Sequence, residues 1–420
     1  MSDRATTRRV LLASLAGTGV EFYDFYIFAT ATSLFFGPLF FPASSALAQQ
    51  MAAFASLALA FFARPIGAAL FGHFGDRIGR KSTLVASLLL MGGSTTLIAF
   101  LPTYQMAGAL APLLLCLLRI GQGLGLGGEW GGAALLAVEH APPGWRGRFG
   151  MVPQLGAPLG FLAANGFFLV LGLTMSSEAL TAWGWRIPFL VSAVLVGLGL
   201  WVRLTLSETP AFAAALAEAP PERVPFAAVF QRHLGATLAG TFGVVACFAL
   251  YYIATAFALS WGTGAGGYSR TDFLQAQLGG ILFMAAGILA SGWLSDRFDP
   301  RRVLIWGCLM TVVTGAVLGP LLGSGSLALV FVWLALALTA MGFVYGPLGA
   351  WLPGLFPPRV RYTGASIAFN VGGILGGGLA PLVATALAAQ RGLAPVGLYL
   401  GGCAVISLVA LVAAGRRSAA

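Results

Sequence analysis

Apolar stretches of about 20 residues, separated by short polar segments, recur along the whole chain. A stretch of this length crosses a bilayer as an α-helix, whereas membrane-spanning β-strands alternate over about ten residues. The pattern therefore predicts an all-α membrane protein with twelve transmembrane helices. The expected spans are 10–36, 47–71, 82–101, 108–138, 149–173, 184–205, 234–261, 271–294, 303–322, 326–352, 363–388 and 394–414.

One polar segment is longer than the others. It covers residues 207–233 and contains four prolines, which favour turns and extended chain over helix. We therefore expect a linker here, between an N-terminal half (1–206) and a C-terminal half (234–420) of six helices each.

A short repeat supports this division. The run GHFGDR (72–77) follows the second predicted helix, and GWLSDR (292–297) follows the eighth. The aspartates at positions 76 and 296 lie 220 residues apart, about half the chain. Parallel repeats of six helices occur in one large class of transporters.

Charged residues make up only 9% of the chain, whereas soluble domains devote about a quarter of their residues to charge. Most of the surface is therefore expected to face lipid. The net charge of +10 is distributed unevenly, because the side opposite the termini receives only Arg186, Arg270 and Arg391. By the positive-inside rule this places both termini in the cytoplasm, in a bacterial inner membrane. The basic residues thus report topology, and no nucleic-acid partner is expected.

The loop GHFGDRIGRK (72–81) closely resembles the hallmark loop of the major facilitator superfamily. Glycines in it would let two helices pack closely. Asp76 can bond an arginine or a helix N-terminus and so form a latch that opens as the halves move. The resemblance assigns the latch to Gly72, Asp76, Arg77, Gly79, Arg80, Asp296 and Arg297.

Longer segments resemble the metabolite:proton symporter family. They are GTGVEFYDFYIF, FFARPIGAALFGHFGDRIGRK, LLRIGQGLGLGGEWGGAALLAVEHAP, WGWRIPFL and FPPRVRYTGASIAFNVGG. That family contains bacterial permeases for 2-oxoglutarate, shikimate, citrate, and proline with betaine. The resemblance implies twelve helices, proton-coupled uptake and alternating access, but it names no substrate. One departure is Asp299-Pro300 in the second loop copy, where the first has Gly79.

Ionisable residues well inside membrane helices cost at least about 2.5–3.5 kcal/mol and are functional candidates. The chain has five: Glu21, Asp24, Arg64, Arg119 and Glu129. Glu21 and Asp24 lie one turn apart near the bilayer midplane, and two carboxylates so close do not both ionise easily. We expect proton coupling at Glu21, Asp24 and Glu129. The alternative is that the acids pair with arginines to hold helices together.

Arg119 and Gln122 share a face of the fourth predicted helix with Glu129. We expect Arg119 to bind a substrate carboxylate or, when the site is empty, a carboxylate of the first helix. Arg64 is expected in a structural ion pair with Glu129, which competes evenly with a role of Glu129 in proton release. Further substrate-binding candidates are Gln122, Gln154, Tyr251, Gln277, Tyr345 and Asn370, although aromatic residues in membrane helices more often pack or lie at the interface.

These features favour a monomeric symporter that carries a small organic carboxylate or zwitterion with protons, without a cofactor or metal. An exporter of drugs or metabolites on the same fold is the alternative. It is less favoured, because GAPLGFLAANG (156–166) resembles the drug-antiporter motif only in part. A membrane enzyme would need a nucleophile with its base or a metal cluster, and the sequence shows neither. A sensor would need a sizeable soluble domain, which is also missing from the pattern.

Overall fold

The structure is a computed structural model that describes residues 2–42, 45–78, 80–127, 129–139, 141–205, 225–357 and 360–417. All regular secondary structure in these ranges is helical, which confirms the predicted all-α class. Gly79 of the predicted latch and most of the predicted linker lie outside the described residues. The latch residues Gly72, Asp76, Arg77 and Arg80, and also Glu129, are described only as backbone.

The described residues before 206 are here called the first half. Its elements are α1 (Ser2–Ala31), the π-helical turn η1 (Thr32–Phe36), α2 (Gly37–Phe40), α3 (Ala46–Ile78), α4 (Arg80–Ile98), α5 (Tyr104–Ala107), α6 (Leu110–Leu126), α7 (Glu129–Glu139), α8 (Arg146–Gln154), α9 (Gly156–Thr174), α10 (Ser177–Ala182), the 3₁₀ turn η2 (Gly184–Arg186) and α11 (Ile187–Thr205).

The described residues from 225 onward are the second half. They form α13 (Pro225–Arg232), α14 (Leu234–Gly243), α15 (Val245–Tyr252), the π-helical turn η3 (Ile253–Phe257), α16 (Ala258–Thr263), α17 (Arg270–Arg297), α18 (Pro300–Ala316), α19 (Leu318–Leu322), α20 (Leu327–Tyr345), α21 (Leu348–Gly354), α22 (Arg361–Gly373), the π-helical turn η4 (Ile374–Gly378), α23 (Ala380–Arg391) and α24 (Leu393–Arg417).

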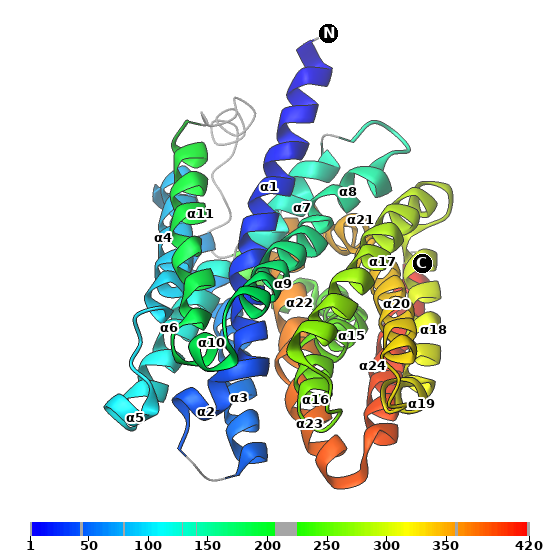
Figure 1. Cartoon of the computed structure of the whole chain (residues 1–420). Coiled ribbons are helices and arrows are strands. Elements are labelled where there is room, and N and C mark those ends of the chain that lie inside the picture. The colour runs from blue at the N-terminus through cyan, green and yellow to red at the C-terminus, as the bar shows by residue number, and fades with distance from the viewer. Residues whose placement is uncertain are drawn as a thin grey trace.

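Joined end to end, these elements make six long helical passes in each half, and the two halves stand side by side in Figure 1. We call the end that carries the N-terminus and the α7–α8 and α17–α18 connections the upper end. The opposite end, with α5, α16 and α19, is the lower end. Two helices project well past their predicted spans, because α1 already begins at Ser2 and α3 continues to Ile78. A helix satisfies its own backbone hydrogen bonds, so it can continue outside the hydrocarbon.

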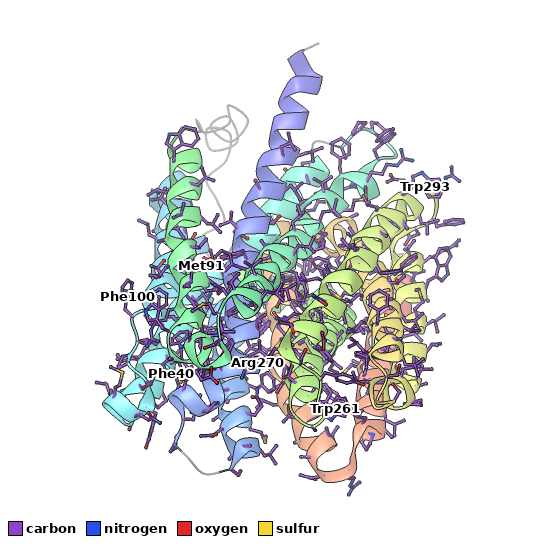
Figure 2. The ribbon with its side chains drawn as sticks, viewed as in Figure 1. Phe40, Met91, Phe100, Trp261, Arg270 and Trp293 are labelled. Carbon is purple, nitrogen blue, oxygen red and sulfur yellow. The ribbon has the colours of Figure 1, made fainter. Side chains whose placement is uncertain are left out.

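Several passes are long and apolar enough to cross a membrane. Among the described residues these are Ala46–Phe71, Arg146–Thr174, Gly184–Trp201, Leu234–Thr263, Arg270–Arg297, Leu327–Gly354, Arg361–Arg391 and Leu393–Gly415, and two shorter apolar helices cover Val85–Ile98 and Leu110–Leu126. Large apolar side chains on their outer surfaces are exposed, such as Leu97 and Val194, and Figure 2 shows the same for Phe100 in the turn after α4. Lipid-facing helices need such a surface.

Glycines bring helix backbones into direct contact where the passes cross. A Cβ atom on Gly123 of α6 would lie 2.3 Å from the carbonyl oxygen of Ala60 on α3. A Cβ atom on Gly349 of α21 would lie equally close to the carbonyl oxygen of Gly150 on α8. Small residues permit this approach in membranes, where packing replaces the hydrophobic effect as the force between helices. The α8–α21 contact joins the two halves, so no side chain separates them there.

We predict that Gly123→Ala lowers the thermal unfolding midpoint, because the added methyl group forces α3 and α6 apart at a cost of about 1–3 kcal/mol. Gly93→Ala in α4 is the matched control. Its Cβ atom meets nothing within 4 Å, and alanine favours helix over glycine by about 1 kcal/mol. Midpoints measured in detergent that fall equally for both variants would contradict the close packing of α3 on α6.

Candidate functional site

A cavity lies between the two halves, near the middle of the long helices. Its volume is about 50 Å³, and one ordered water molecule needs about 10–15 Å³, so several waters fit. The first half supplies residues from α1, α3, α6, α7 and α9, and the second half from α15, α20 and α22. The lining residues are Thr18, Glu21, Phe22, Tyr26, Arg64, Leu126, Trp130, Ala157, Cys247, Phe248, Tyr251, Tyr252, Met341, Tyr345, Phe369 and Asn370.

Arg64 is the cationic side chain on the wall of this cavity. It projects from α3, is 6% exposed, and its guanidinium carbon lies 4.5 Å from the ring centres of both Phe25 and Phe61. Its Nε has no hydrogen-bond partner in the described part of the chain. Arg64 therefore keeps donor capacity free while two aromatic faces stabilise its charge.

A second arginine lies behind the cavity wall. Arg119 on α6 is completely buried, with its guanidinium carbon 3.7 Å from the ring centre of Phe28 and 4.7 Å from that of Phe25. It donates hydrogen bonds to Gln122 Oε1 and, at 3.5 Å, to the carbonyl oxygen of Leu57. Its Nε lacks a partner among the described residues.

Neither arginine has an acidic partner within 4 Å among the described residues, where the ion pair found is Arg148–Asp296. The predicted Arg64–Glu129 pair stays a prediction, because the side chain of Glu129 lies outside the description. Among the described side chains, rings and not carboxylates compensate the two buried guanidinium groups, whose desolvation is costly. These groups therefore make the site attractive to an anion.

The two acids of the first helix lie in different surroundings. Glu21 lines the cavity and interacts electrostatically with Arg64. Asp24 is fully buried away from the cavity, where Ser192 of α11 donates a 2.6 Å hydrogen bond to its Oδ1. Residues three apart point about 60° apart around a helix. At the edge of the interface between the halves, that angle turns Glu21 into the cavity and Asp24 into the first half.

Gln122 connects Arg119 to this inner part of the first half. It accepts the Arg119 hydrogen bond, and its Nε2 donates to the backbone oxygen of Asp24 at 3.2 Å and to Thr95 Oγ1 at 2.9 Å. Gln122 is not among the cavity-lining residues. Its amide is engaged within the first half, so it positions Arg119.

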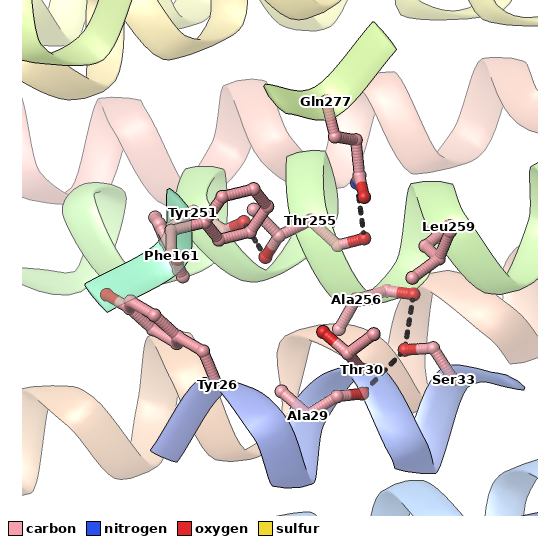
Figure 3. Close-up of a pocket in the computed structure, with 10 residues that line it drawn as sticks. All are labelled: Tyr26, Ala29, Thr30, Ser33, Phe161, Tyr251, Thr255, Ala256, Leu259 and Gln277. Atoms are coloured by element: carbon pink, nitrogen blue, oxygen red, sulfur yellow. Dashed lines mark hydrogen bonds between the residues drawn. The ribbon is translucent and has the colours of Figure 1, made fainter. Parts of the chain in front are cut away.

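Of the second-half candidates, Tyr251, Tyr345 and Asn370 line the cavity. The hydroxyl groups of both tyrosines are buried, beside Tyr26 and Trp130 respectively. Gln277 lies instead in a smaller pocket of about 10 Å³, shown in Figure 3. There its Nε2 donates to the carbonyl oxygens of Ala254 and Thr255 at 3.0 and 2.9 Å.

Contacts between the halves close the cavity toward the upper end. The rings of Trp130 on α7 and Phe369 on α22 stack in parallel at 3.7 Å. Asn370 Nδ2 donates to the carbonyl oxygen of Gly127 at 2.8 Å. Gln154 accepts the Trp130 indole hydrogen bond at 3.1 Å and donates to the carbonyl oxygen of Tyr345 at 3.2 Å. Gln154 and Asn370 therefore join the two halves.

A different set of contacts closes the cavity toward the lower end. Tyr26 of the first half and Tyr251 of the second stack with ring centres 5.2 Å apart, and both rings meet Phe161 edge-on. All three residues line the smaller pocket (Figure 3), and Tyr26 and Tyr251 line the central cavity as well, so these two tyrosines lie between the two spaces. Beyond them, Ser33 Oγ donates to the carbonyl oxygen of Ala256 at 3.0 Å, joining the halves again.

Asp296, at the upper end, clamps the second half to the first. Its carboxylate accepts the backbone N–H groups of Gly147 at 2.7 Å and Arg148 at 3.3 Å, at the start of α8, and pairs with Arg148 Nε at 3.1 Å. A carboxylate at a helix N-terminus also gains from the helix dipole. This is the geometry that a latch requires. Arg297 contributes differently, because its guanidinium packs over Trp293 at 3.7 Å.

Several cavity residues escaped the prediction from sequence. The aromatic residues Phe22, Tyr26, Trp130, Phe248, Tyr252 and Phe369 line the wall. The sequence signal for an aromatic cavity wall is the high density of rings in FYDFYIF (22–28), a run that contains Asp24 and directly follows Glu21. Aromatic residues are common in all membrane helices, so this signal alone does not separate a cavity wall from packing.

Two halves of six helical passes, with a cavity between them that is lined by a carboxylate and a guanidinium group, are the arrangement of a membrane transporter. Comparison with known proteins agrees. The sugar (and other) transporter family matches residues 10–219. The chain is 47% identical to the inner membrane metabolite transport protein YhjE of Escherichia coli K12, over 96% of this chain and 93% of that protein. It is 37% identical to the shikimate transporter of the same organism, over 96% and 94% of the two chains.

Solved structures share the fold at low identity. The xylose transporter XylE from E. coli, in a partially occluded inward-open conformation, matches with a TM-score of 0.74 at 16% identity, over 97% of this chain and 96% of that one. The chain belongs to the sugar (and other) transporter family of the major facilitator superfamily, which confirms the fold expected from the loop GHFGDRIGRK. It is a transporter and not an enzyme.

We predict that Asp296→Ala opens the upper end more often, because the clamp on the start of α8 is lost. Cys247 lines the cavity and serves as the reporter, with Cys116, Cys308 and Cys403 replaced by alanine. A membrane-impermeant maleimide should label Cys247 several-fold faster in the vesicle orientation that exposes the upper end. Asp299→Ala is the control, because Asp299 caps α18 within the second half. Equal labelling rates for both variants would show that the Asp296 contact does not hold the upper end closed.

Proposed function

We propose that the protein takes up a small organic anion together with protons by alternating access. The observation that carries this proposal is the pair of buried arginines, Arg64 and Arg119, without an acidic partner among the described residues. Glu21 on the same cavity wall supplies the group that takes the proton. The relatives support a metabolite as cargo, because one is a shikimate transporter and another a proline/betaine transporter at 29% identity.

Coupling follows from competition for one guanidinium. When Glu21 is ionised, its charge and a substrate carboxylate both draw on Arg64. Protonation of Glu21 removes this competitor, so that the substrate carboxylate binds Arg64 and one proton accompanies one anion. Substrate release in turn frees Arg64 to stabilise ionised Glu21, and the proton leaves. Asp24 is the second proton candidate, because its protonation would weaken the hydrogen bond that Ser192 of α11 donates to it.

Access alternates through the two sets of contacts between the halves. Opening the upper end requires the Trp130–Phe369 stack and the Asp296 clamp to separate. Opening the lower end requires Tyr26 and Tyr251 to part. The positive-inside rule supports a cytoplasmic upper end, because the basic residues gather there, and the lower end is then the entrance. This agrees with the inner-membrane location named for the relative YhjE.

A zwitterion is the second candidate cargo. Half of the cavity-lining side chains are aromatic, and aromatic faces attract quaternary ammonium groups by cation–π interaction. A betaine would place its carboxylate on Arg64 and its ammonium group among the rings of Tyr252, Tyr345 and Phe248. Both cargo classes share the carboxylate, so Arg64 is needed for either.

We predict that Arg64→Ala weakens carboxylate binding by about a hundredfold, because two charge-assisted hydrogen bonds worth about 3 kcal/mol together are lost. The measurement is the shift of the thermal midpoint by shikimate or glycine betaine, since a ligand of the native state raises it. Arg186→Ala is the control, because Arg186 donates only to the backbone oxygens of Ala182 and Leu101. Unchanged binding by the Arg64 variant would refute this assignment.

We predict that Glu21→Gln abolishes uptake driven by a proton gradient while leaving substrate exchange across proteoliposomes intact. An amide cannot carry the proton, but it also does not compete for Arg64. Asp24→Asn, tested in parallel, separates the two candidates, because the residue whose variant loses only proton-driven uptake is the carrier. Active efflux of the substrate against its gradient would instead favour the exporter.

A further inference from the structure

One phenyl ring in the first half contacts two positive charges. Phe25 on α1 is 2% exposed, and its ring centre is 4.5 Å from the guanidinium carbon of Arg64 and 4.7 Å from that of Arg119. Each arginine also has a ring of its own, Phe61 for Arg64 and Phe28 for Arg119. Phe25 is therefore the ring that the two arginines share.

The two guanidinium groups beside this ring repel each other. The positive charge of Arg64 acts directly on Arg119, and both lie in a region of low dielectric where such repulsion is strong. A carboxylate between them would remove the repulsion. The negative face of an aromatic ring also attracts a cation, so Phe25 stabilises both charges from one position.

A ring and a carboxylate differ in how many guanidinium N–H groups they leave free for a ligand. A carboxylate accepts hydrogen bonds from a guanidinium and occupies its N–H groups. A ring stabilises the charge through its face and accepts few or none of them. Consistent with this, the Nε atoms of both arginines lack hydrogen-bond partners among the described residues. The donors thus stay available without a loss of charge stabilisation.

We propose that Phe25 is a positioning residue that keeps Arg64 and Arg119 charged while the Nε–H group of each stays unoccupied, so that an incoming anion finds free donors. Phe25 forms no hydrogen bond with the anion and acts through the arginines alone. The proposal rests on the proposed function only in naming the cargo as an anion. The ring–arginine interaction itself exists in the empty protein and can be measured there.

The first test needs no ligand. Phe25→Leu is made in the natural protein and in a variant with Arg64→Leu and Arg119→Leu, and thermal midpoints are compared as a double-mutant cycle. Phe25→Leu should lower the midpoint clearly in the natural background and by less than half as much when both arginines are gone. Phe168→Leu is the control, because Phe168 is equally buried and packs on Phe35. Its effect should be the same in both backgrounds.

Equal losses for Phe25→Leu in both backgrounds would overturn the proposal, because Phe25 would then be ordinary packing. If Phe25→Leu does not fold, pentafluorophenylalanine at position 25 decides the question. It preserves the shape of the ring and reverses the sign of its face. A midpoint lowered in the natural background alone supports the proposal, and an unchanged midpoint refutes it.

The second test uses shikimate as the probe anion in the full-length protein. Phe25→Leu should weaken shikimate binding about tenfold, and Phe25→Tyr, which keeps the ring, should restore it to within about twofold. Equal weakening by both variants would contradict the proposal. If the unmodified protein binds no organic anion, the proposed function fails, and the ligand-free cycle still decides the role of Phe25.

Discussion

Two guanidinium groups, buried without an acidic partner within 4 Å among the described side chains, are the constraint on which the rest of this structure depends. Arg64 and Arg119 lie inside a helical bundle that faces lipid, where an uncompensated charge costs several kcal/mol. Rings from α1 and α3 lower that cost but do not occupy the N–H groups. A carboxylate placed beside these guanidinium groups would therefore stabilise the folded protein. Binding of such a group from outside is therefore favourable, and the protein need not change its own packing to provide the attraction.

The contacts between the two halves also bear on how the protein moves. Near the cavity they include stacked rings and single hydrogen bonds, such as Trp130 on Phe369 and Ser33 on Ala256, beside the packing of α17 on α8 and α9. At the upper end backbones touch directly at Gly150 and Gly349. At these two glycines the helices meet through their backbones, so no interlocking side chains have to be pulled apart there. Surfaces of this kind can separate and rejoin at low cost, which a transporter must do in every cycle.

The sequence predicted the fold well and the site unevenly, for physical reasons. Hydropathy identifies a membrane helix because every such helix must bury its backbone polar groups, and Arg64 and Arg119 were evident because charge is rare in lipid. Periodicity alone does not show which face of α1 meets the other half, so the separate surroundings of Glu21 and Asp24 could not be predicted. The aromatic partner Phe25 was also missed, because a ring that stabilises a charge and a ring that only packs look identical in sequence.

The π-helical turns at the lower end have a mechanical consequence. η1 and η3 touch each other across the two halves, and each is a turn wound more widely than the helix around it. In η3 the carbonyl oxygens of Ala254 and Thr255 accept hydrogen bonds from the side chain of Gln277 on α17. Part of the hydrogen bonding there is thus carried by a side chain, which can rotate away and return. The lower end can therefore bend at these turns when the Gln277 hydrogen bonds break, whereas the continuous α-helices beside it stay straight.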